Sequence, residues 1–314
     1  MRFLAYRKEV MSKEHAQPTL NVDIPTFVDK LEKSLEAKNL QVVTWDDIDP
    51  QAIYQQLENP NWAPWLEASI DSIAGRASVF SEGQLLLVNK DGIPMASLSI
   101  NRINWDGNPD TLPTWDEIAG DPTDYSQTYQ PEGNTYVLMS MNVSPAGRGQ
   151  RLPTALINKV QIMAYQEDIE YIVGSFRPNE FGKKKQESQQ ALDFWEYVTE
   201  MKTTRVDEQG VFGEAGSEVD LPLDAWLRSL SWVGMNILVE DPSAMVVTVS
   251  LEEFEHYKQT YKPDSWWQDE SGLWHCSEVG CWLVDEASKS ATYVESNVFG
   301  SLPVLADADA EAGA

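Results

Sequence analysis

Alternating hydrophobic and polar residues mark several short strands along this chain. Residues 84–89 (QLLLVN) and 94–103 (PMASLSINRI) flank a KDG turn, which predicts a β-hairpin. The second of these strands alternates apolar residues with serines and Asn101, so we expect one packed face and one polar face. Residues 40–45 (LQVVTW) predict another strand. The stretch 169–176 (IEYIVGSF) is apolar almost throughout, which indicates a strand covered on both faces.

The stretch 135–143 (TYVLMSMNV) also alternates, and a regular strand there would present two different faces. One face would carry Val137, Met139, Met141 and Val143, and the other Tyr136, Leu138, Ser140 and Asn142. The strand leads into a loop with two glycines, two prolines and two arginines (SPAGRGQRLP). A helix is predicted from Thr154, with Leu156, Val160 and Met163 along one stripe.

Apolar residues spaced three and four apart predict the other helices. We expect them at residues 20–38, 46–59, 64–81 and 223–234. Further along, 235–240 (MNILVE) and 244–250 (AMVVTVS) are separated by DPS, and we expect an antiparallel hairpin there. The order of elements mixes helices and strands, which indicates an α/β (α+β) chain.

The pattern divides the chain into three parts. Residues 1–38 are expected to form an N-terminal helical extension, and 39–250 a core with two inserts, 104–134 and 178–221. Residues 251–314 would be a tryptophan-rich extension with a disordered acidic tail. The first insert has seven acidic residues and no lysine or arginine, and is longer than most loops of compact domains. It is therefore either functional or disordered, and its aromatic residues favour order.

The composition is that of a globular protein with a strong excess of negative charge. The 314 residues include 50 Asp and Glu against 23 Lys and Arg, for a net charge of −27. This charge argues against nucleic acids and anionic membranes as partners, because both bind through clusters of cations. It suits an amine substrate, although solubility alone also explains it.

The sequence shows no leader segment and no metal site. No apolar run reaches the roughly 18 residues of a membrane span, and the first fifteen residues lack the apolar centre of a signal peptide. Cys276 and Cys281 are too few for a disulfide framework, and with His275 they supply only three of the four ligands of a structural zinc site. We therefore expect a cytoplasmic protein without a metal.

The loop at 143–153 (VSPAGRGQRLP) concentrates positive charge in this acidic chain. The first turn of a helix has free N–H groups, and its dipole favours an anion. Arg148 and Arg151 would add charge at the same place, which indicates a phosphate-binding loop. The loop has neither the Gly-Lys-Ser/Thr of a P-loop nor a G-x-G-x-x-G fingerprint. An ordinary surface turn, with arginines paired to nearby acids, is the alternative.

The order of elements and this loop together resemble the GNAT superfamily of N-acetyltransferases over about residues 39–250. In that family the fourth strand ends in V-x-P, followed by an Arg/Gln-x-x-Gly-x-Gly/Ala loop. Val143, Pro145 and Arg148 match this pattern. The stretch 231–238 (SWVGMNIL) looks like the glycine–aromatic segment that opens the sixth strand in that family.

The resemblance implies both a fold and a cofactor. The fold would be a mixed, mostly antiparallel sheet flanked by helices, with a V-shaped opening between its fourth and fifth strands. Acetyl-CoA or another acyl-CoA would place its pyrophosphate on Arg148, Gly149, Gln150, Arg151, Leu152, Pro153 and Thr154. Backbone N–H groups near Met141 and Val143 would bind the pantetheine and polarise the thioester carbonyl. Asn179 would contact the pantetheine arm.

Two residues depart from the family loop. Arg151 and Pro153 occupy its two glycine positions. Pro153 suits a helix start but removes one N–H donor. The acyl donor would then be held in a different way, or be carried on the pantetheine arm of an acyl carrier protein.

The usual proton-transfer groups of the family are also missing. Its fourth strand often carries a carboxylate base, and a tyrosine about four residues before the helix-ending glycine, here Gly234, serves as the acid. Neither is present here. The catalytic candidates on the strand are Tyr136, Ser140 and Asn142. The candidates for a water-linked base or for substrate contacts, each with a structural role as the alternative, are Asp116, Glu117, Asp121 and Arg177.

These features predict an acyl-CoA-dependent N-acyltransferase that acts on a small amine, or on an amine of a larger metabolite. Drifted chemistry is one alternative: hydrolysis or decarboxylation of an acyl-pantetheine, or transfer from a carrier protein. A non-catalytic CoA-binding regulator is another. A homodimer also stays open, because the tryptophans of 251–314 must pack on their own core or complete a dimer.

Overall fold

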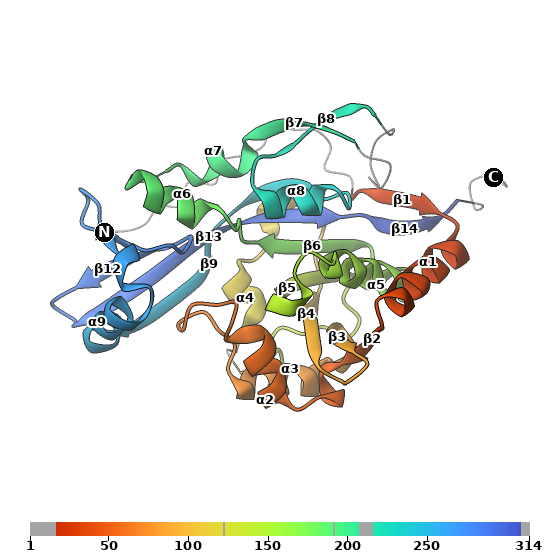
Figure 1. Cartoon of the computed structure of the whole chain (residues 1–314), viewed down its shortest axis with the longest axis horizontal. Coiled ribbons are helices and arrows are strands. Elements are labelled where there is room, and N and C mark those ends of the chain that lie inside the picture. Colours follow the sequence, from red (N-terminus) through yellow and green to blue (C-terminus); the bar gives the residue numbers. More distant parts are fainter. Residues whose placement is uncertain (1–16, 122, 191, 207–215, 309–314) are drawn as a thin grey trace.

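The computed structural model describes residues 17–121, 123–190, 192–206 and 216–308. Its centre is a ten-stranded sheet in the order β10–β11–β12–β13–β6–β5–β4–β3–β2, with β9 along the other edge of β13 (Figure 1). Neighbouring strands are antiparallel except β5 and β6, which run parallel. The expected mixed, mostly antiparallel sheet is therefore confirmed.

The strands of this sheet are β2 (Leu40–Thr44), β3 (Gln84–Asn89), β4 (Pro94–Ile103), β5 (Thr135–Val143), β6 (Tyr171–Phe176), β9 (Asn236–Ser250), β10 (Trp267–Gln268), β11 (Trp274–His275), β12 (Cys281–Asp285) and β13 (Ser290–Leu302). Two small pairs lie outside it: β1 (Thr19–Val22) with β14 (Val304–Asp307), and β7 (Met201–Arg205) with β8 (Glu218–Pro222).

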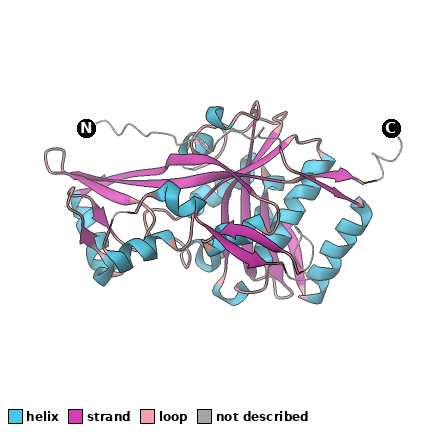
Figure 2. Ribbon diagram, turned by 90° about the horizontal axis from the view of Figure 1, so that it is seen from above, coloured by secondary structure: helices cyan, strands magenta, loops and turns pink. Residues whose placement is uncertain are grey.

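Helices cover both faces of the sheet (Figure 2). They are α1 (Ile24–Ala37), α2 (Pro50–Ile53), α3 (Ile70–Val79), α4 (Trp115–Ala119), α5 (Leu152–Gln166), α6 (Phe181–Ser188), α7 (Phe194–Thr199), α8 (Ala225–Ser231) and α9 (Leu251–Thr260). A π-helical turn, Tyr54–Glu58, continues α2. Single 3₁₀ turns lie at Trp45–Asp47, Ser81–Gly83, Pro109–Thr111, Pro145–Gly147 and Pro263–Ser265. No helix in the described ranges is long and apolar enough to cross a membrane.

The N-terminal helix begins later than its apolar spacing predicts. Residues 19–22 form β1, which pairs in parallel with β14 near the other end of the chain. Asp23 then caps α1, because its carboxylate accepts the Thr26 N–H at 2.8 Å, and Pro25 occupies the first turn. The acidic tail likewise starts as strand at 306–307 before it passes, at 309, outside the described residues.

The predicted hairpin at 235–250 is wrong. The whole segment is one strand, β9, which pairs with β13 along its length. The DPS sequence lies inside it, opposite a register shift between Glu295 and Asn297. Pro242 is tolerated there because β13 is the only strand that pairs with β9 among the described residues, and an edge strand can lack one N–H donor.

The expected boundary at residue 250 does not coincide with a boundary in the sheet. β13, which belongs to the expected C-terminal extension, lies between β6 and β9. Five aromatic residues of this region pack on Trp65, with ring centres 5.0–5.9 Å from its own: Tyr257, Tyr261, Trp266, Trp282 and Tyr293. The region therefore packs against the rest of its own chain.

The polar face expected for β4 is buried rather than solvated. Ser97, Ser99 and Asn101 are all fully buried, because the first insert and α3 cover this side of the sheet. Ser99 exchanges a hydrogen bond with the Tyr125 hydroxyl at 2.7 Å, and Asn101 Nδ2 donates to the Ile118 carbonyl at 2.9 Å. The first insert is thus an ordered layer around α4.

Candidate functional site

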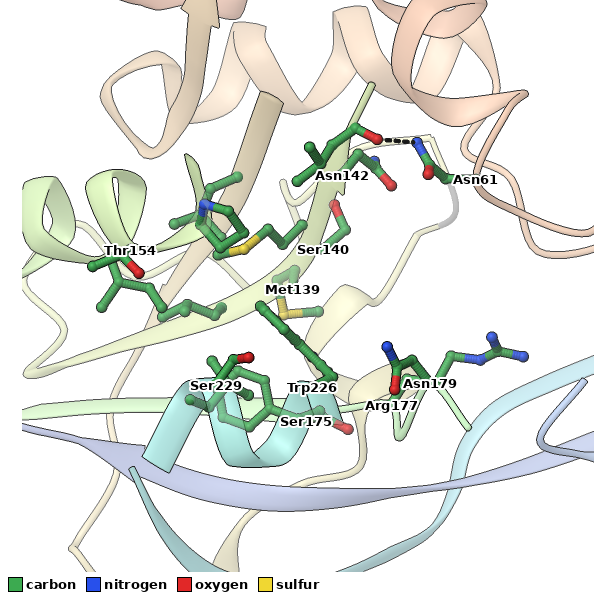
Figure 3. A pocket seen from close by; sticks show the side chains of 18 of the residues that line it. Asn61, Met139, Ser140, Asn142, Thr154, Ser175, Arg177, Asn179, Trp226 and Ser229 are labelled. Carbon is green, nitrogen blue, oxygen red and sulfur yellow. Dashed lines mark hydrogen bonds between the residues drawn. The ribbon is translucent and has the colours of Figure 1, made fainter. Parts of the chain in front are cut away.

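The expected V-shaped opening lies between β5 and β6. The two strands pair only from Thr135 to Leu138 on β5 and from Tyr171 to Gly174 on β6, and then separate. A cavity of about 590 Å³ occupies the gap, bounded by the ends of both strands, by the loop before α5 and by α8 (Figure 3). Trp226 and Ser229 of α8 face the β5 side across it (Figure 3).

The loop between β5 and α5 is shaped by its small residues. Ser144 Oγ accepts the Gly147 N–H, which closes the turn Pro145–Gly147. A Cβ on Gly147 would lie 2.8 Å from the Met95 carbonyl oxygen, so the backbone approaches β4 closely there. Gly149 and Arg151 then adopt positive φ, 78° and 56°, and the helix starts at Leu152. The chain thereby turns sharply enough to face the start of α5 toward the cavity.

Most of the residues expected to hold the phosphates line this first cavity. They are Arg148, Gly149, Arg151, Pro153 and Thr154. Leu152 instead is fully buried in the core, and the side chain of Gln150 folds back to donate to the Ala146 carbonyl. Arg148 donates to Asn61 Oδ1 at 3.2 Å, and neither arginine pairs with an acid in the part of the chain described. Their charge is thus available to an anion.

A β-bulge changes which residues of β5 share a face. Ser140 pairs with Ser99, whereas Leu138 pairs with the next residue, Ile100, so Met139 is an extra residue in β5. The bulge shifts the alternation by one. Tyr136 and Leu138 therefore lie on the face of Met141, and not with Ser140 and Asn142 as a regular strand would have it.

Tyr136 accordingly does not line the cavity. It is fully buried beside Phe80, and the Arg102 guanidinium lies 5.8 Å from the centre of its ring. Burial raises the pKa of its hydroxyl well above the ordinary value. Among the three catalytic candidates, only Ser140 and Asn142 line the cavity.

Asn142 contacts a buried acid, Glu58, that the sequence motifs did not indicate. Asn142 Nδ2 donates to Glu58 Oε1 at 2.6 Å, and Asn142 Oδ1 accepts the Trp62 indole N–H at 2.7 Å. Glu58 is 2% exposed, and this desolvation raises its pKa to about 7. The only local signal was one glutamate in a predicted helix. The π-helical turn that carries it is of a kind frequent at functional sites.

A second cavity, of about 580 Å³, adjoins the first. The two share Trp62, Trp115, Ser140 and Met245 as lining residues. The buried Ser140 hydroxyl has no hydrogen-bond partner within the described ranges, so it is free to bond to a ligand. The charged residues of the second cavity are Glu58, Glu67, Asp116 and Arg76.

The acids of the first insert take different positions. Asp116 lines the second cavity, accepts the Val246 N–H at 2.8 Å, and has its pKa raised to about 6 by burial. Glu117 is exposed and accepts the Thr114 N–H at the start of α4. Asp121 accepts the Thr123 N–H. Only Asp116 of these three reaches a cavity.

Arg177 lines the first cavity, but its charge is already paired. Its guanidinium donates to Glu295 at 2.7 and 3.0 Å and to Glu278 at 2.7 Å. Although burial opposes it, the Arg177 charge lowers the pKa of Glu278 to about 2. These bonds tie the end of β6 to β13. Asn179, two residues on, lines the cavity and is exposed.

Neither Lys185 of α6 nor the pair Cys276 and Cys281 forms a further site in the part of the chain described. Lys185 is 3% exposed, and its ammonium group donates to the carbonyls of Val279 and Gly280, at 2.6 and 2.9 Å. It is therefore a buried structural lysine. No group of three His, Cys, Asp or Glu residues in the described ranges could hold a metal ion.

Comparisons with known proteins bear on the fold. No protein-family model and no curated protein matches the sequence. The loading GNATL domain of CurA from Lyngbya majuscula superposes with a TM-score of 0.51 at 15% identity, over 85% of this chain and 97% of that domain. The GphF GNAT-like decarboxylase in complex with isobutyryl-CoA gives a TM-score of 0.49 at 18% identity, over 84% and 98%. A mosquito arylalkylamine N-acetyltransferase like 5b gives 0.36 at 11%, over 84% and 99%.

Nearly the whole length of the CurA domain matches this chain. At 15% identity the match establishes a shared architecture and leaves the activity open. The mixed sheet, the parallel β5–β6 pair and the opening beyond it agree with the fold that the sequence resemblance implied. This chain therefore has a divergent GNAT-like fold.

Proposed function

We propose that this protein is an acyl-CoA-dependent N-acyltransferase, with the acyl donor in the first cavity and the amine in the second. The observation that carries the proposal is the meeting of the two cavities at Ser140, where the second cavity is also lined by the buried Glu58. One side offers cations and a helix start, and the other offers carboxylates. The phosphates of an acyl-CoA and the ammonium group of a substrate need these opposite environments.

The donor side suits a phosphorylated pantetheine. The first turn of α5 offers free N–H groups, and Arg148 and Arg151 add positive charge beside it. Beyond Leu138 the edge of β5 no longer pairs with β6. The amides of a pantetheine arm could form hydrogen bonds along this free edge, as an added strand does.

The acceptor side suits proton removal from an amine. With a pKa of about 7, Glu58 is a much stronger base than an ordinary carboxylate, and about half of it is ionised at neutral pH. It takes one proton from the substrate ammonium group. The buried Ser140 hydroxyl can donate to the thioester oxygen as negative charge develops there.

The reaction is then a direct displacement. The amine nitrogen attacks the thioester carbonyl carbon, a C–N bond forms, and the carbonyl electron pair moves to oxygen. When the pair returns, the C–S bond breaks and CoA leaves as a thiolate. The nitrogen loses its second proton to the thiolate or to water. Ammonium and acyl-CoA thus give an amide, CoA thiol and one proton.

The leaving thiolate has no tyrosine beside it at the end of α8. Ser229 lines the cavity, but its hydroxyl donates to the Ala225 carbonyl at 2.8 Å. A thiol with a pKa of about 8.5 forms a comparatively stable anion, so the thiolate can leave first and take its proton from water.

Calorimetric titration with CoA and acetyl-CoA, together with thiol release with and without a panel of amines, tests the proposal. Binding with amine-dependent release is the expected result. Release without an amine would instead indicate a hydrolase, and binding without any release a CoA-binding regulator. If neither CoA nor acetyl-CoA binds, the proposed donor is wrong.

A carrier-bound acyl group is the second candidate for the donor. Pro153 at the helix start removes one N–H from the phosphate site, and Arg151 replaces a glycine of the family loop. A phosphopantetheine arm carries one phosphate where CoA carries three, so it needs fewer donors. Thiol release from an acylated carrier protein that exceeds release from acetyl-CoA would favour this donor.

A further inference from the structure

The second cavity contains one buried arginine among its acids. Arg76, on α3, is 5% exposed and lines this cavity. Its Nε–H is buried without a hydrogen-bond partner, and its side chain forms no ion pair within the described ranges. Buried arginines are normally paired with an anion, because an unpaired charge is costly to desolvate.

The neighbours of Arg76 leave its charge available. Its guanidinium lies 5.0 Å from the centre of the Tyr125 ring, which supplies a cation–π contact on one side. Glu58 is close enough for the two charges to interact, but no hydrogen bond or ion pair joins the two side chains within the described ranges. Arg76 therefore keeps donors for a further acceptor.

The charged residues of the second cavity are complementary to a zwitterion, which carries one ammonium group and one carboxylate. Glu58 and Asp116 offer negative charge for an ammonium group, and Arg76 offers donors in the forked geometry that fits a carboxylate. The remaining wall includes Trp62, Trp65 and Trp115, which suit an apolar or aromatic side chain. The volume of about 580 Å³ has room for such a side chain.

We infer that the second cavity is an amino-acid site, in which Arg76 binds the carboxylate and the acids receive the ammonium group. The acceptor would be an amino acid with a large apolar or aromatic side chain. The inference rests on the proposed function for the fate of the amine, but the carboxylate contact is a binding property that can be measured by itself.

The test compares amino acids with the amines that lack only their carboxylate. Wild-type protein is titrated, with and without CoA present, with phenylalanine and 2-phenylethylamine, tryptophan and tryptamine, and leucine and 3-methylbutylamine. A charge-assisted contact predicts that each amino acid binds about 10- to 100-fold more tightly than its partner. Equal affinity within the pairs, or tighter binding of the amines, would overturn the inference.

Variants assign the difference to one residue. Arg76→Met should bring the ratio of affinities within each pair to about one, and Arg76→Lys should keep part of it. Arg102→Met is the matched control, because Arg102 is also largely buried but lines neither cavity, and its ratio should stay at the wild-type value. A ratio unchanged in Arg76→Met would contradict the assignment. The wild-type comparison still decides the question if that variant does not fold.

Two further outcomes keep this inference separate from the proposed function. Acylation of the simple amines but of none of the amino acids would leave the acyltransferase intact and overturn the amino-acid site. Arg76→Met could instead weaken the binding of malonyl-CoA more than that of acetyl-CoA. The carboxylate that Arg76 binds would then belong to the acyl group, and this result would also overturn the amino-acid site. Absence of CoA binding, with the amino-acid preference intact, would overturn only the proposed function.

Discussion

The two cavities beside β5 differ in how their walls are assembled. The longest run of residues around the first comes from one continuous stretch, in which strand, loop and helix start follow one another from 138 to 154. The second draws its charged groups from separate segments: Glu58 from the π-helical turn, Arg76 from α3 and Asp116 from the first insert. A wall made of consecutive residues leaves a readable local pattern, whereas one assembled from distant segments does not.

The electrostatics of the two cavities differ in the same way. Arg148 and Arg151 are exposed to solvent. Glu58 is shielded from water, and its pKa rises to about 7. The positive charge of the first cavity can thus be read from the residue types in the sequence. The charge state of the second cavity depends on burial, which the sequence does not give.

The largest expected effect comes from removing the proposed base of the second cavity. Glu58→Gln should lower kcat by about 100- to 10,000-fold, because the base is removed while the hydrogen bond from Asn142 keeps an acceptor. Steady-state kinetics with CoA affinity measured in parallel checks this, and the affinity should not change.

In the wild type kcat should rise with pH toward about 7, as Glu58 ionises. Glu36→Gln, on the exposed side of α1, is the control. An unchanged kcat in Glu58→Gln would exclude it as the base.

A substitution of Arg177 tests whether this cavity residue binds the substrate or stabilises the fold. Arg177→Met should reduce the free energy of unfolding by about 3–5 kcal/mol, because Glu295 is fully buried and would lose its partner. Urea unfolding measures this. The exposed Arg205→Met should change stability by less than about 0.5 kcal/mol. A stable Arg177→Met protein with altered substrate affinity would return Arg177 to the list of substrate contacts.

Buried Glu58 should also leave a mark on stability. Its pKa is about 7 in the folded chain against 4.5 in the unfolded one, so the folded state binds more protons between these values and stability falls as pH rises. Glu58→Gln removes that loss. The free energy of unfolding of Glu58→Gln minus that of the wild type should therefore increase between pH 5 and pH 8, by on the order of 3 kcal/mol. A difference that is flat with pH, as expected for Glu36→Gln, would show that Glu58 is not desolvated.

The smallest expected effect concerns the first cavity. Arg148→Glu should weaken CoA binding by about 10- to 100-fold, because it places a negative charge where the pyrophosphate is expected. Lys159→Glu, on α5 outside both cavities, makes the same change in net charge and should have little effect. Calorimetry at low and moderate salt compares the two. Equal affinity for wild type and Arg148→Glu would mean that the loop is not the phosphate site.

Local sequence signals account for much of the fold. The hairpin of β3 and β4, the strands β5 and β6, and the helices α5 and α8 all appear where period and turn residues predict them. Errors occur where the partner is distant. β1 looks like the first turns of α1 until β14 pairs with it, and β9 looks like a hairpin until β13 pairs with it throughout.

The site shows the same division. The turn at 144–151 and the helix start follow from the glycines, the prolines and their order, so the sequence by itself determined the loop and its positive charge. The bulge at Met139 could not be predicted, because it is defined only by the register with β4, and it decides which residues of β5 face Glu58. Only the tertiary structure removed water from Glu58, Asp116 and Arg76. Their chemistry depends on what surrounds them, and those surroundings come from segments far apart in the chain.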